Sequence, residues 1–297
     1  MNRDGEKSDE RDPLARALDD AIAGRSQPLY ALLARGSHLP GTRMNAPLAD
    51  AFAALCRACG ARSDPVAFAL ARLSPDEAPG STALEFLPVC GVLAMAARGA
   101  GAEKGRARFV AELHARADDL RFRVRDAVVT GLSRVGAAAG DALVGDVAPW
   151  MDGYFHAAAV VRALAAESWL SALHDATGVV ARFDDAFGLL REAPRAAARW
   201  PGHKALLEAV EEGVPAVTLR FGVPVFDMLA RWSEARDPVL RELVAAVIVA
   251  PRVASRFGVE AARVRGVLEA SEPAPRNPDH DVGPTRDRSK SRRRGKR

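Results

Sequence analysis

One stretch of the chain is similar to another that lies 32 residues later, and this internal repeat restricts the possible folds most strongly. Residues 122–132 align with residues 154–164 and match them at an aromatic residue, an alanine, two valines and a leucine. From residue 82 to residue 270, segments of helical character are separated by short clusters of helix-breaking residues. Helical units that recur about every 30 to 45 residues cannot bury their apolar faces alone, so they stack on one another. We therefore predict a stacked array of helices.

Composition points the same way and argues against a sheet of any size. The 297 residues include 60 alanines, and alanine is the best helix former because it loses no side-chain entropy in a helix. Only two isoleucines and two tyrosines are present, so two of the residue types that favour strands are nearly missing. Hydrophobic residues make up 48% of the chain, which is enough to bury a large core. The fold class predicted is all-α.

Breaker residues and charge divide the chain into four regions. Residues 1–12 are an acidic, polar lead that we expect to be disordered. Residues 13–73 form an irregular N-terminal helical region that glycines and prolines interrupt, and the proline-rich residues 74–81 connect it to the third region. That third region, residues 82–270, carries the helical repeats. Residues 271–297 hold four prolines and hardly any apolar side chain, so we expect a disordered basic tail.

The positive charge of the chain is concentrated in this tail. The chain has a net charge of +4, and residues 271–297 contribute nine basic against four acidic residues, which leaves −1 for residues 1–270. Nucleic-acid binding through the tail would proceed by counterion release without base reading, because the tail has no aromatic side chain to stack on bases. The alternative is a solubilising end. The tail residues predicted to contact nucleic acid are Arg292, Arg293, Arg294, Lys296 and Arg297.

Several features predict a cytoplasmic protein that does not enter a membrane. The first 12 residues are charged and do not resemble a secretory signal. The longest apolar run, residues 86–97, is shorter than the roughly 20 residues of a spanning helix. Three cysteines form no even disulfide framework and agree with a reducing compartment. Arginines outnumber lysines 37 to 5, which indicates GC-rich coding and a bacterial source.

A helix start is predicted at Asp237-Pro-Val-Leu-Arg241, which combines an N-capping aspartate with a proline suited to the first helical turn. This opening and residues 123–128 (Arg-Val-Arg-Asp-Ala-Val) resemble the second helix of HEAT repeats. With residues 85–91 (Glu-Phe-Leu-Pro-Val-Cys-Gly), they make roughly residues 70–250 similar to uncharacterised bacterial HEAT-repeat proteins. These belong to the ARM-type helical superfamily, which includes the DNA alkylation repair glycosylases. The resemblance implies a right-handed α-solenoid of antiparallel helix pairs, with a concave face made by the second helices.

Such an array implies a non-catalytic binding or scaffold protein that engages a protein partner or nucleic acid. The alternative is a DNA alkylation repair glycosylase-like enzyme that excises alkylated bases, a branch whose motif Trp and Asp lie four residues apart on one helical face. Here Trp150 and Asp152 lie two apart, which on a helix points them away from each other. The other three tryptophans have no aspartate at the required spacing. No catalytic residue is therefore predicted.

Four arginines near predicted helix starts are candidate phosphate ligands. Arg121, Arg123 and Arg125 lie within one turn of a HEAT-like helix start, and Arg241 occupies a comparable place near the end of the array. Arginines in such places can contact phosphates in bidentate geometry. The alternative is a structural role, because the arginine of a HEAT helix opening commonly pairs with an aspartate of the neighbouring repeat. The aspartates available for this are Asp119, Asp126 and Asp237.

Two short motifs have some of the residues of metal sites, and neither is expected to bind a metal or another cofactor. Cys56 and Cys59 form a CxxC, but tetrahedral zinc needs two further ligands, so small buried side chains are the expected role. His174-Asp175 resembles the metal motif of HD phosphohydrolases, although its spacing to other ligands fits poorly. The further ligands available to that motif are His114 or His156, with Asp184 or Asp185.

Overall fold

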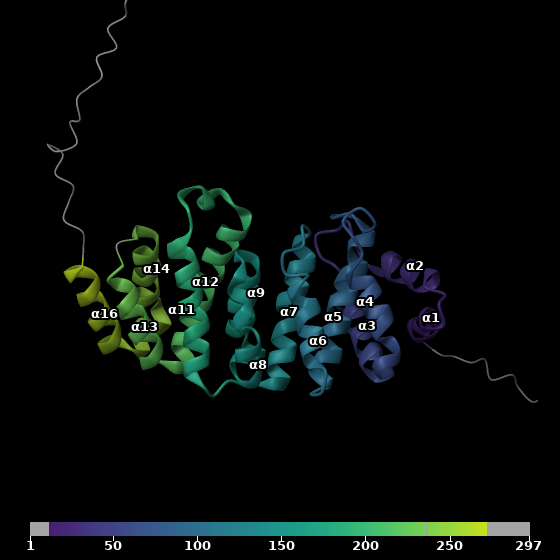
Figure 1. The fold of residues 1–297 in the computed structure, drawn as a ribbon, viewed down its shortest axis with the longest axis horizontal. Helices are drawn as coiled ribbons and strands as arrows, with labels where there is room; N and C mark the ends of the chain where they lie inside the picture. The colour runs from purple at the N-terminus through teal and green to yellow at the C-terminus, as the bar shows by residue number, and fades with distance from the viewer. Residues whose placement is uncertain (1–11, 236, 272–297) are drawn as a thin grey trace, which may run out of the picture.

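Every regular element is a helix in the part of the chain that the computed structural model describes, residues 12–235 and 237–271 (Figure 1). This confirms the prediction of an all-α protein, which rests on the abundance of alanine and the scarcity of strand-forming residues. The predicted acidic lead at residues 1–12 and the predicted basic tail at residues 271–297 lie outside the described residues, apart from Asp12 and Ser271.

The first half of the chain forms eight α-helices and two short 3₁₀ helices. They are α1 (Pro13–Ile22), α2 (Gln27–Gly36), α3 (Ala46–Cys59), η1 (Gly60–Ser63), α4 (Asp64–Ala71), η2 (Ala83–Glu85), α5 (Phe86–Gly101), α6 (Arg106–His114), α7 (Phe122–Ala139) and α8 (Ala142–Asp146). Residues 13–73, predicted as an irregular helical region, thus hold α1 to α4 with η1. The proline-rich residues 74–81 lie between α4 and η2 and contain no helix.

The second half continues in the same way. Its elements are η3 (Ala148–Asp152), α9 (Tyr154–Ala165), α10 (Glu167–Leu170), α11 (Ala176–Glu192), η4 (Arg195–Arg199), α12 (Pro201–Phe221), α13 (Val223–Ser233), α14 (Pro238–Val249), α15 (Pro251–Arg256) and α16 (Gly258–Ala270). The two copies of the internal repeat begin α7 and α9, and these two helices pack against each other. The repeat therefore marks equivalent parts of neighbouring helices.

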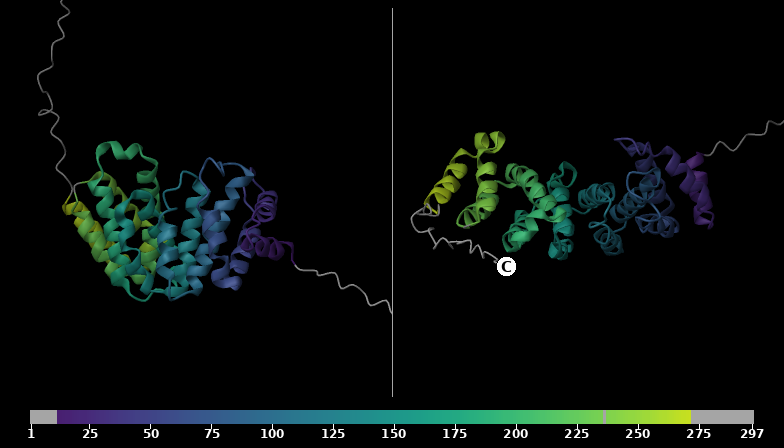
Figure 2. Two further views of the ribbon diagram at one scale, coloured as in Figure 1. Left: turned by 45° about the vertical axis from the view of Figure 1, so that its right-hand side comes forward. Right: turned by 90° about the horizontal axis from the view of Figure 1, so that it is seen from above.

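The helices succeed one another along the long axis of the molecule, with α1 at one end and α16 at the other (Figure 1). The same order is seen when the molecule is viewed from above (Figure 2). Contacts between helices are accordingly those of neighbours: α5 packs on α4 and α7, α7 on α9, and α9 on α12. The apolar core runs the length of this row, because each helix buries its apolar stripe against the next.

Side-chain caps fix where several of the helices begin. Asp12 accepts a hydrogen bond from the backbone N–H of Leu14 at the start of α1. Asp237 accepts from two N–H groups at the start of α14, and Pro238 is the first residue of that helix, as the sequence indicates. At the other end of a helix, Gly140 comes directly after α7 with φ of 58°, a conformation that glycine adopts without strain.

Helix α5 is a long apolar helix and lies in the core. Among the described residues, the stretch Ala83–Gly101 is the one helix long and apolar enough to cross a membrane by length and composition alone. Most of it, 72%, is buried against other helices of the row. At Gly91 the backbones of α5 and α4 approach closely, since a Cβ atom there would lie 2.3 Å from the backbone N of Ala71 in α4. Packing against α3, α4 and α7 accounts for the apolar sequence of α5.

Candidate functional site

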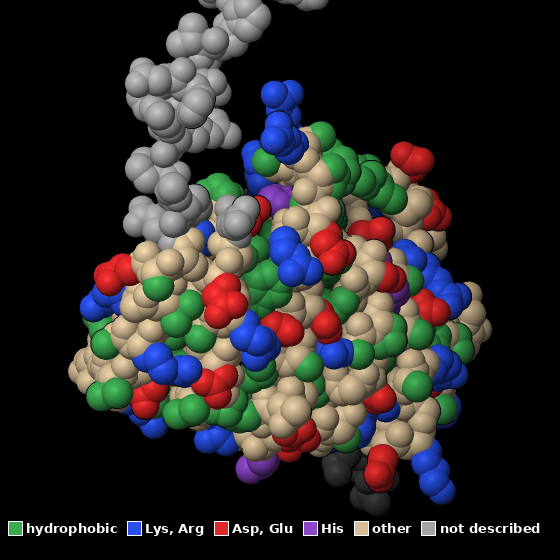
Figure 3. Space-filling view, turned by 60° about the vertical axis from the view of Figure 1, so that its left-hand side comes forward, with side chains coloured by type: hydrophobic (Ala, Val, Ile, Leu, Met, Phe, Trp, Pro, Cys, Tyr) green, Lys and Arg blue, Asp and Glu red, His purple; other side chains and the backbone are tan. Residues whose placement is uncertain are grey.

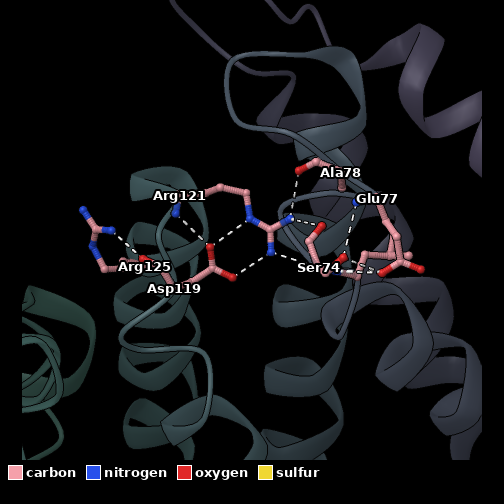
Figure 4. A network of polar contacts seen from close by, with 7 residues as sticks. Ser74, Glu77, Ala78, Asp119, Arg121 and Arg125 are labelled. Atoms are coloured by element: carbon pink, nitrogen blue, oxygen red, sulfur yellow. Dashed lines mark hydrogen bonds and ion pairs between the residues drawn. The ribbon is translucent and has the colours of Figure 1, made fainter.

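Arg121, the first of the candidate phosphate ligands, is buried and directs its guanidinium group into the protein (Figure 4). Its Nε and Nη2 donate to the two carboxylate oxygens of Asp119 at 2.8 and 2.7 Å. Its remaining N–H groups donate to main-chain carbonyls: Leu73 at 2.8 Å, Ser74 at 3.3 Å and Ala78 at 2.9 Å. An arginine has five N–H donors, so these five hydrogen bonds use them all.

This network joins the start of α7 to the segment after α4, and it sets the charge of Asp119. Burial alone would raise the pKa of Asp119, but the hydrogen bonds from Arg121 and the positive charge of Arg121 outweigh burial and lower that pKa. The carboxylate is therefore ionised next to the cationic guanidinium. Asp119 is one of the aspartates named as a structural partner, although it lies two residues before Arg121 and belongs to the same segment.

The other two candidate arginines at the start of α7 also contact protein groups. Arg123 forms an ion pair with the buried Glu85 at 2.9 Å. Arg125 donates to the main-chain carbonyl of Asp119 at 2.5 Å, and its guanidinium lies 4.4 Å from the ring centroid of Phe155.

Arg241 lies at the far end of the row, where it ties the end of α13 to the end of α16. It donates to the carbonyls of Ser233 at 2.6 Å and Leu268 at 2.5 Å, and to Oγ of Ser271 at 2.8 Å. The carboxylate of Asp237, another of the aspartates named as partners, caps the start of α14. The predicted tail contacts, Arg292, Arg293, Arg294, Lys296 and Arg297, lie outside the described residues.

The four tryptophans differ in how much of their rings solvent can reach. Trp150, Trp169 and Trp232 are buried, whereas Trp200 is 46% exposed. The indole N–H of Trp232 donates to Oδ1 of Asp184 at 2.7 Å, so the structure does bring a tryptophan and an aspartate together. They come from different helices and lie 48 residues apart, which is why spacing along the sequence does not reveal the pair.

This Trp232–Asp184 pair lies in an open cleft of about 840 Å³ between α11 and α13, called here the α11–α13 cleft. Both basic and acidic side chains line it, and some of them are paired: Asp184 faces Arg231 at 3.2 Å, and Asp185 faces Arg182 at 2.9 Å. Burial and the neighbouring Asp184 raise the pKa of Asp185, against the lowering effect of Arg182. The charged side chains that line the cleft are Arg182, Arg191, Arg231, Asp184, Asp185, Glu192 and Glu234.

The surface around the α13–α16 end of the molecule has the same mixed character. Figure 3 shows this face with lysine and arginine side chains interspersed among aspartate and glutamate. Apolar side chains lie between the charged ones, and no single sign of charge covers the visible described surface.

Two of the three cysteines, including the first cysteine of the CxxC, are buried in the core. Cys56 is buried, and burial raises the pKa of its thiol to about 12, with the nearby Cys59 adding to the effect. Cys90 is also buried, and burial raises the pKa of its thiol well above the ordinary value. A thiol must lose its proton to act as a nucleophile or metal ligand, so Cys56 and Cys90 behave as small core residues.

Metal-ligating side chains gather elsewhere, at the junction of α6, η3 and α9. Within the described residues, one group of three offers ligand atoms that all lie within 4.8 Å of one another: His114, Asp152 and His156, called here the His–Asp cluster. His174, by contrast, is 78% exposed and faces Asp141 at 3.7 Å. The His174-Asp175 motif is therefore not part of the cluster, although His114 and His156 are the histidines that the sequence offers as its partners.

No family model, curated protein or solved structure matches the chain.

Proposed function

We propose that the chain is a non-catalytic helical-repeat protein that binds a protein partner, and that its row of helices is a HEAT-like, right-handed α-solenoid of antiparallel pairs. Three observations support the solenoid: helices stacked in chain order, repeat copies in the adjacent helices α7 and α9, and a capped opening at Asp237. The observation that carries the binding proposal is the α11–α13 cleft, which is lined by both basic and acidic side chains.

The sign of the charges favours a polypeptide over nucleic acid in this cleft. Three arginines and four acidic residues line it, so a phosphate backbone would meet more repulsion than attraction there. A polypeptide segment with both signs of charge finds partners for each group. The helix-start arginines that could have formed a phosphate-binding surface are engaged with Asp119, Glu85 and main-chain carbonyls.

Tryptophan burial supports the non-catalytic proposal over the glycosylase alternative. A repair enzyme that works on a base needs an aromatic face against which to place it. Three of the four rings are buried in the core, and the exposed Trp200 lies beside the ring of Tyr154, with 6.1 Å between centroids. A base-release assay on alkylated DNA tests the alternative directly, and release above background by the purified chain would establish it.

Reversing two charges in the cleft is expected to weaken capture of the partner at least about tenfold, because each new glutamate faces the acidic side chains already there. Arg191 and Arg231 are exposed, so the Arg191→Glu/Arg231→Glu variant should fold normally. Wild type and variant are immobilised and used to capture proteins from nuclease-treated lysate of the source organism. Captured proteins are identified by mass spectrometry, and the affinity of each purified candidate is then measured.

The matched control is Arg43→Glu/Arg62→Glu, which makes the same charge change near the opposite end of the row. A partner of the cleft is retained by the wild type and this control and lost by the cleft variant. The capture is repeated with lysate that has not been treated with nuclease. Equal loss in both variants, or capture seen only from the untreated lysate, would contradict a protein-binding cleft and favour a nucleic-acid role.

The basic tail gives a second, separable prediction. Deleting residues 286–297 is expected to abolish salt-sensitive retention on DNA cellulose, because seven of the last ten residues are basic. A shuffled tail of the same composition should be retained like the wild type, since counterion release does not depend on order. A tail of equal length with glutamine in place of each basic residue should elute at the same salt concentration as the deletion variant. Retention that is unchanged by the deletion would locate nucleic-acid binding in the helical body.

A further inference from the structure

Three side chains from three separate elements converge in the His–Asp cluster. Nε2 of His114, the last residue of α6, lies 3.2 Å from Oδ2 of Asp152 at the end of η3. Nδ1 of His156, in the first turn of α9, lies 2.7 Å from Oδ1 of the same carboxylate. The two imidazole rings are 4.0 Å apart between centroids. We propose that His114, Asp152 and His156 bind a divalent transition-metal ion of the zinc class.

The surrounding packing holds these side chains in place. Trp150 is buried and meets the His114 ring edge-on, with 5.0 Å between centroids. Asp152 and His156 are four residues apart across the start of α9, so one local turn brings them together. Gly153 lies between them, and a Cβ atom there would be 3.1 Å from Nδ1 of His156, tighter than most such contacts. The absence of a side chain at this position leaves room for the imidazole.

The spacing of the ligand atoms suits a small tetrahedral ion. Bonds of about 2.0 to 2.2 Å place any two ligand atoms of a tetrahedral zinc about 3.3 Å apart. Oδ1 of Asp152 lies 3.3 Å from Nε2 of His114 and 2.7 Å from Nδ1 of His156, so only a small shift is needed for this one oxygen to take that spacing to both imidazoles. Two imidazoles and a carboxylate are ligands that zinc and other late transition metals accept, and Mg²⁺ and Ca²⁺ prefer oxygen ligands alone.

The cluster leaves one side open for a further ligand. The side chain of Asp152 is 51% exposed, and a pocket of about 340 Å³ adjoins it. His114, Trp150 and Asp152 line this pocket together with mainly apolar side chains from α6 and η3. Three protein ligands with an open fourth position are typical of zinc sites that bind water or a small ligand, whereas closed structural sites use four protein ligands. The fourth ligand of this site is accordingly water or a small anionic group entering through the pocket.

The test is metal titration of the full-length chain without an affinity tag, after treatment with a chelator. Isothermal titration with Zn²⁺ at neutral pH is expected to show one site per chain, and Co²⁺ to give the visible absorption of a four- or five-coordinate ion. His156→Ala and His114→Ala should each weaken binding at least about 100-fold, because outer-sphere partners alone are worth roughly 10- to 100-fold. Asp152→Asn, which keeps the shape but loses the charge, should weaken it about tenfold or more.

The matched control is His174→Ala, which removes an exposed histidine outside the cluster and should leave the affinity within about twofold. Circular dichroism verifies that each variant is folded, and Zn²⁺ should raise the melting temperature of the wild type but not of the cluster variants. Two outcomes would overturn the proposal: no binding by the wild type at about 100 µM Zn²⁺, or equal affinity in wild type and His156→Ala. The first would leave a purely hydrogen-bonded cluster, and the second would place the ion elsewhere. The cleft variants are expected to keep the metal site, so the two proposals fail independently.

Discussion

Replacing Arg121 with methionine is expected to lower the free energy of unfolding by about 3 to 5 kcal/mol. The guanidinium is 3% exposed and neutralises the carboxylate of Asp119, which is 6% exposed. Methionine fills much of the same volume but leaves that carboxylate buried without its cation. It also removes the donors to three main-chain carbonyls between α4 and η2, and a buried acceptor without a partner costs about 1 to 3 kcal/mol.

Urea denaturation monitored by far-UV circular dichroism measures the effect. The matched control is Arg134→Met, which breaks a solvent-exposed pair with Asp50 and should cost no more than about 1 kcal/mol. If the two variants lost equal stability, the hydrogen-bonded arrangement around Arg121 would not be a stabilising element of the fold.

The difference in unfolding free energy between wild type and Arg121→Met should also depend on pH, which provides a second readout. In the folded chain the pKa of Asp119 is lowered, because hydrogen bonds and charge from Arg121 outweigh the opposing effect of burial. A lowered pKa contributes stability that is present above the unfolded-state pKa and is lost as pH falls through the folded-state pKa. The variant lacks this contribution. The gap in stability between wild type and Arg121→Met should therefore narrow as the solution is acidified, and a gap that widened would contradict the assignment.

The parts of the fold that could be predicted from sequence are those that depend on local chemistry. Helix content results from alanine and the missing strand formers, residue by residue. The start of α14 results from a cap and a proline that act within one turn, and the structure places Pro238 at its first position. The internal repeat likewise identifies corresponding segments of α7 and α9, because both copies must present the same apolar pattern to their neighbours.

The side-chain sites depend on contacts between distant residues, and these were not predictable. The sequence suggests Arg121 as a phosphate ligand, but its partners in the segment after α4 lie 43 to 48 residues earlier, where no local pattern indicates them. Trp232 and Asp184 meet in the same way across 48 residues.

For the His–Asp cluster, part of the signal is present in the sequence. Asp152 and His156 have the four-residue spacing that places two side chains on one face of a helical turn. The same two residues also belong to other candidate motifs. Asp152 lies two residues after Trp150, and His156 is a possible partner of the His174-Asp175 motif. The third member, His114, lies 38 residues before Asp152 and reaches it only because the end of α6 lies beside η3 in the folded chain. Spacing can indicate two of the ligands, whereas the third needs the tertiary structure.

Replacing Trp169 with alanine is expected to cost about 3 to 5 kcal/mol of stability, the range for losing a large buried aromatic side chain. Trp169 is fully buried where α10 meets α7, and its indole N–H donates to the carbonyl of Gly140 at 3.2 Å. The matched control is Trp200→Ala, the same substitution at a ring that is 46% exposed, with an expected cost below about 1 kcal/mol. Chemical denaturation of both variants gives the comparison, and similar costs would contradict the packing of α10 on α7.

A substitution at Gly136 tests whether the cost of Trp169→Ala comes from the contact between the two residues or from a general weakening of helix α7. Gly136 lies under the indole, and a Cβ atom there would be 2.0 Å from a ring atom of Trp169. Gly136→Ala should therefore cost about 1 to 3 kcal/mol in the wild type, although alanine favours a helix over glycine by about 1 kcal/mol. In the Trp169→Ala background the added methyl group enters the vacated space, so only the helix preference remains and the same substitution should stabilise. The effect of Gly136→Ala on stability should thus change sign between the two backgrounds, because of the contact between these two residues alone. If the stability costs of the two substitutions were instead additive, the ring and the glycine would not constrain each other.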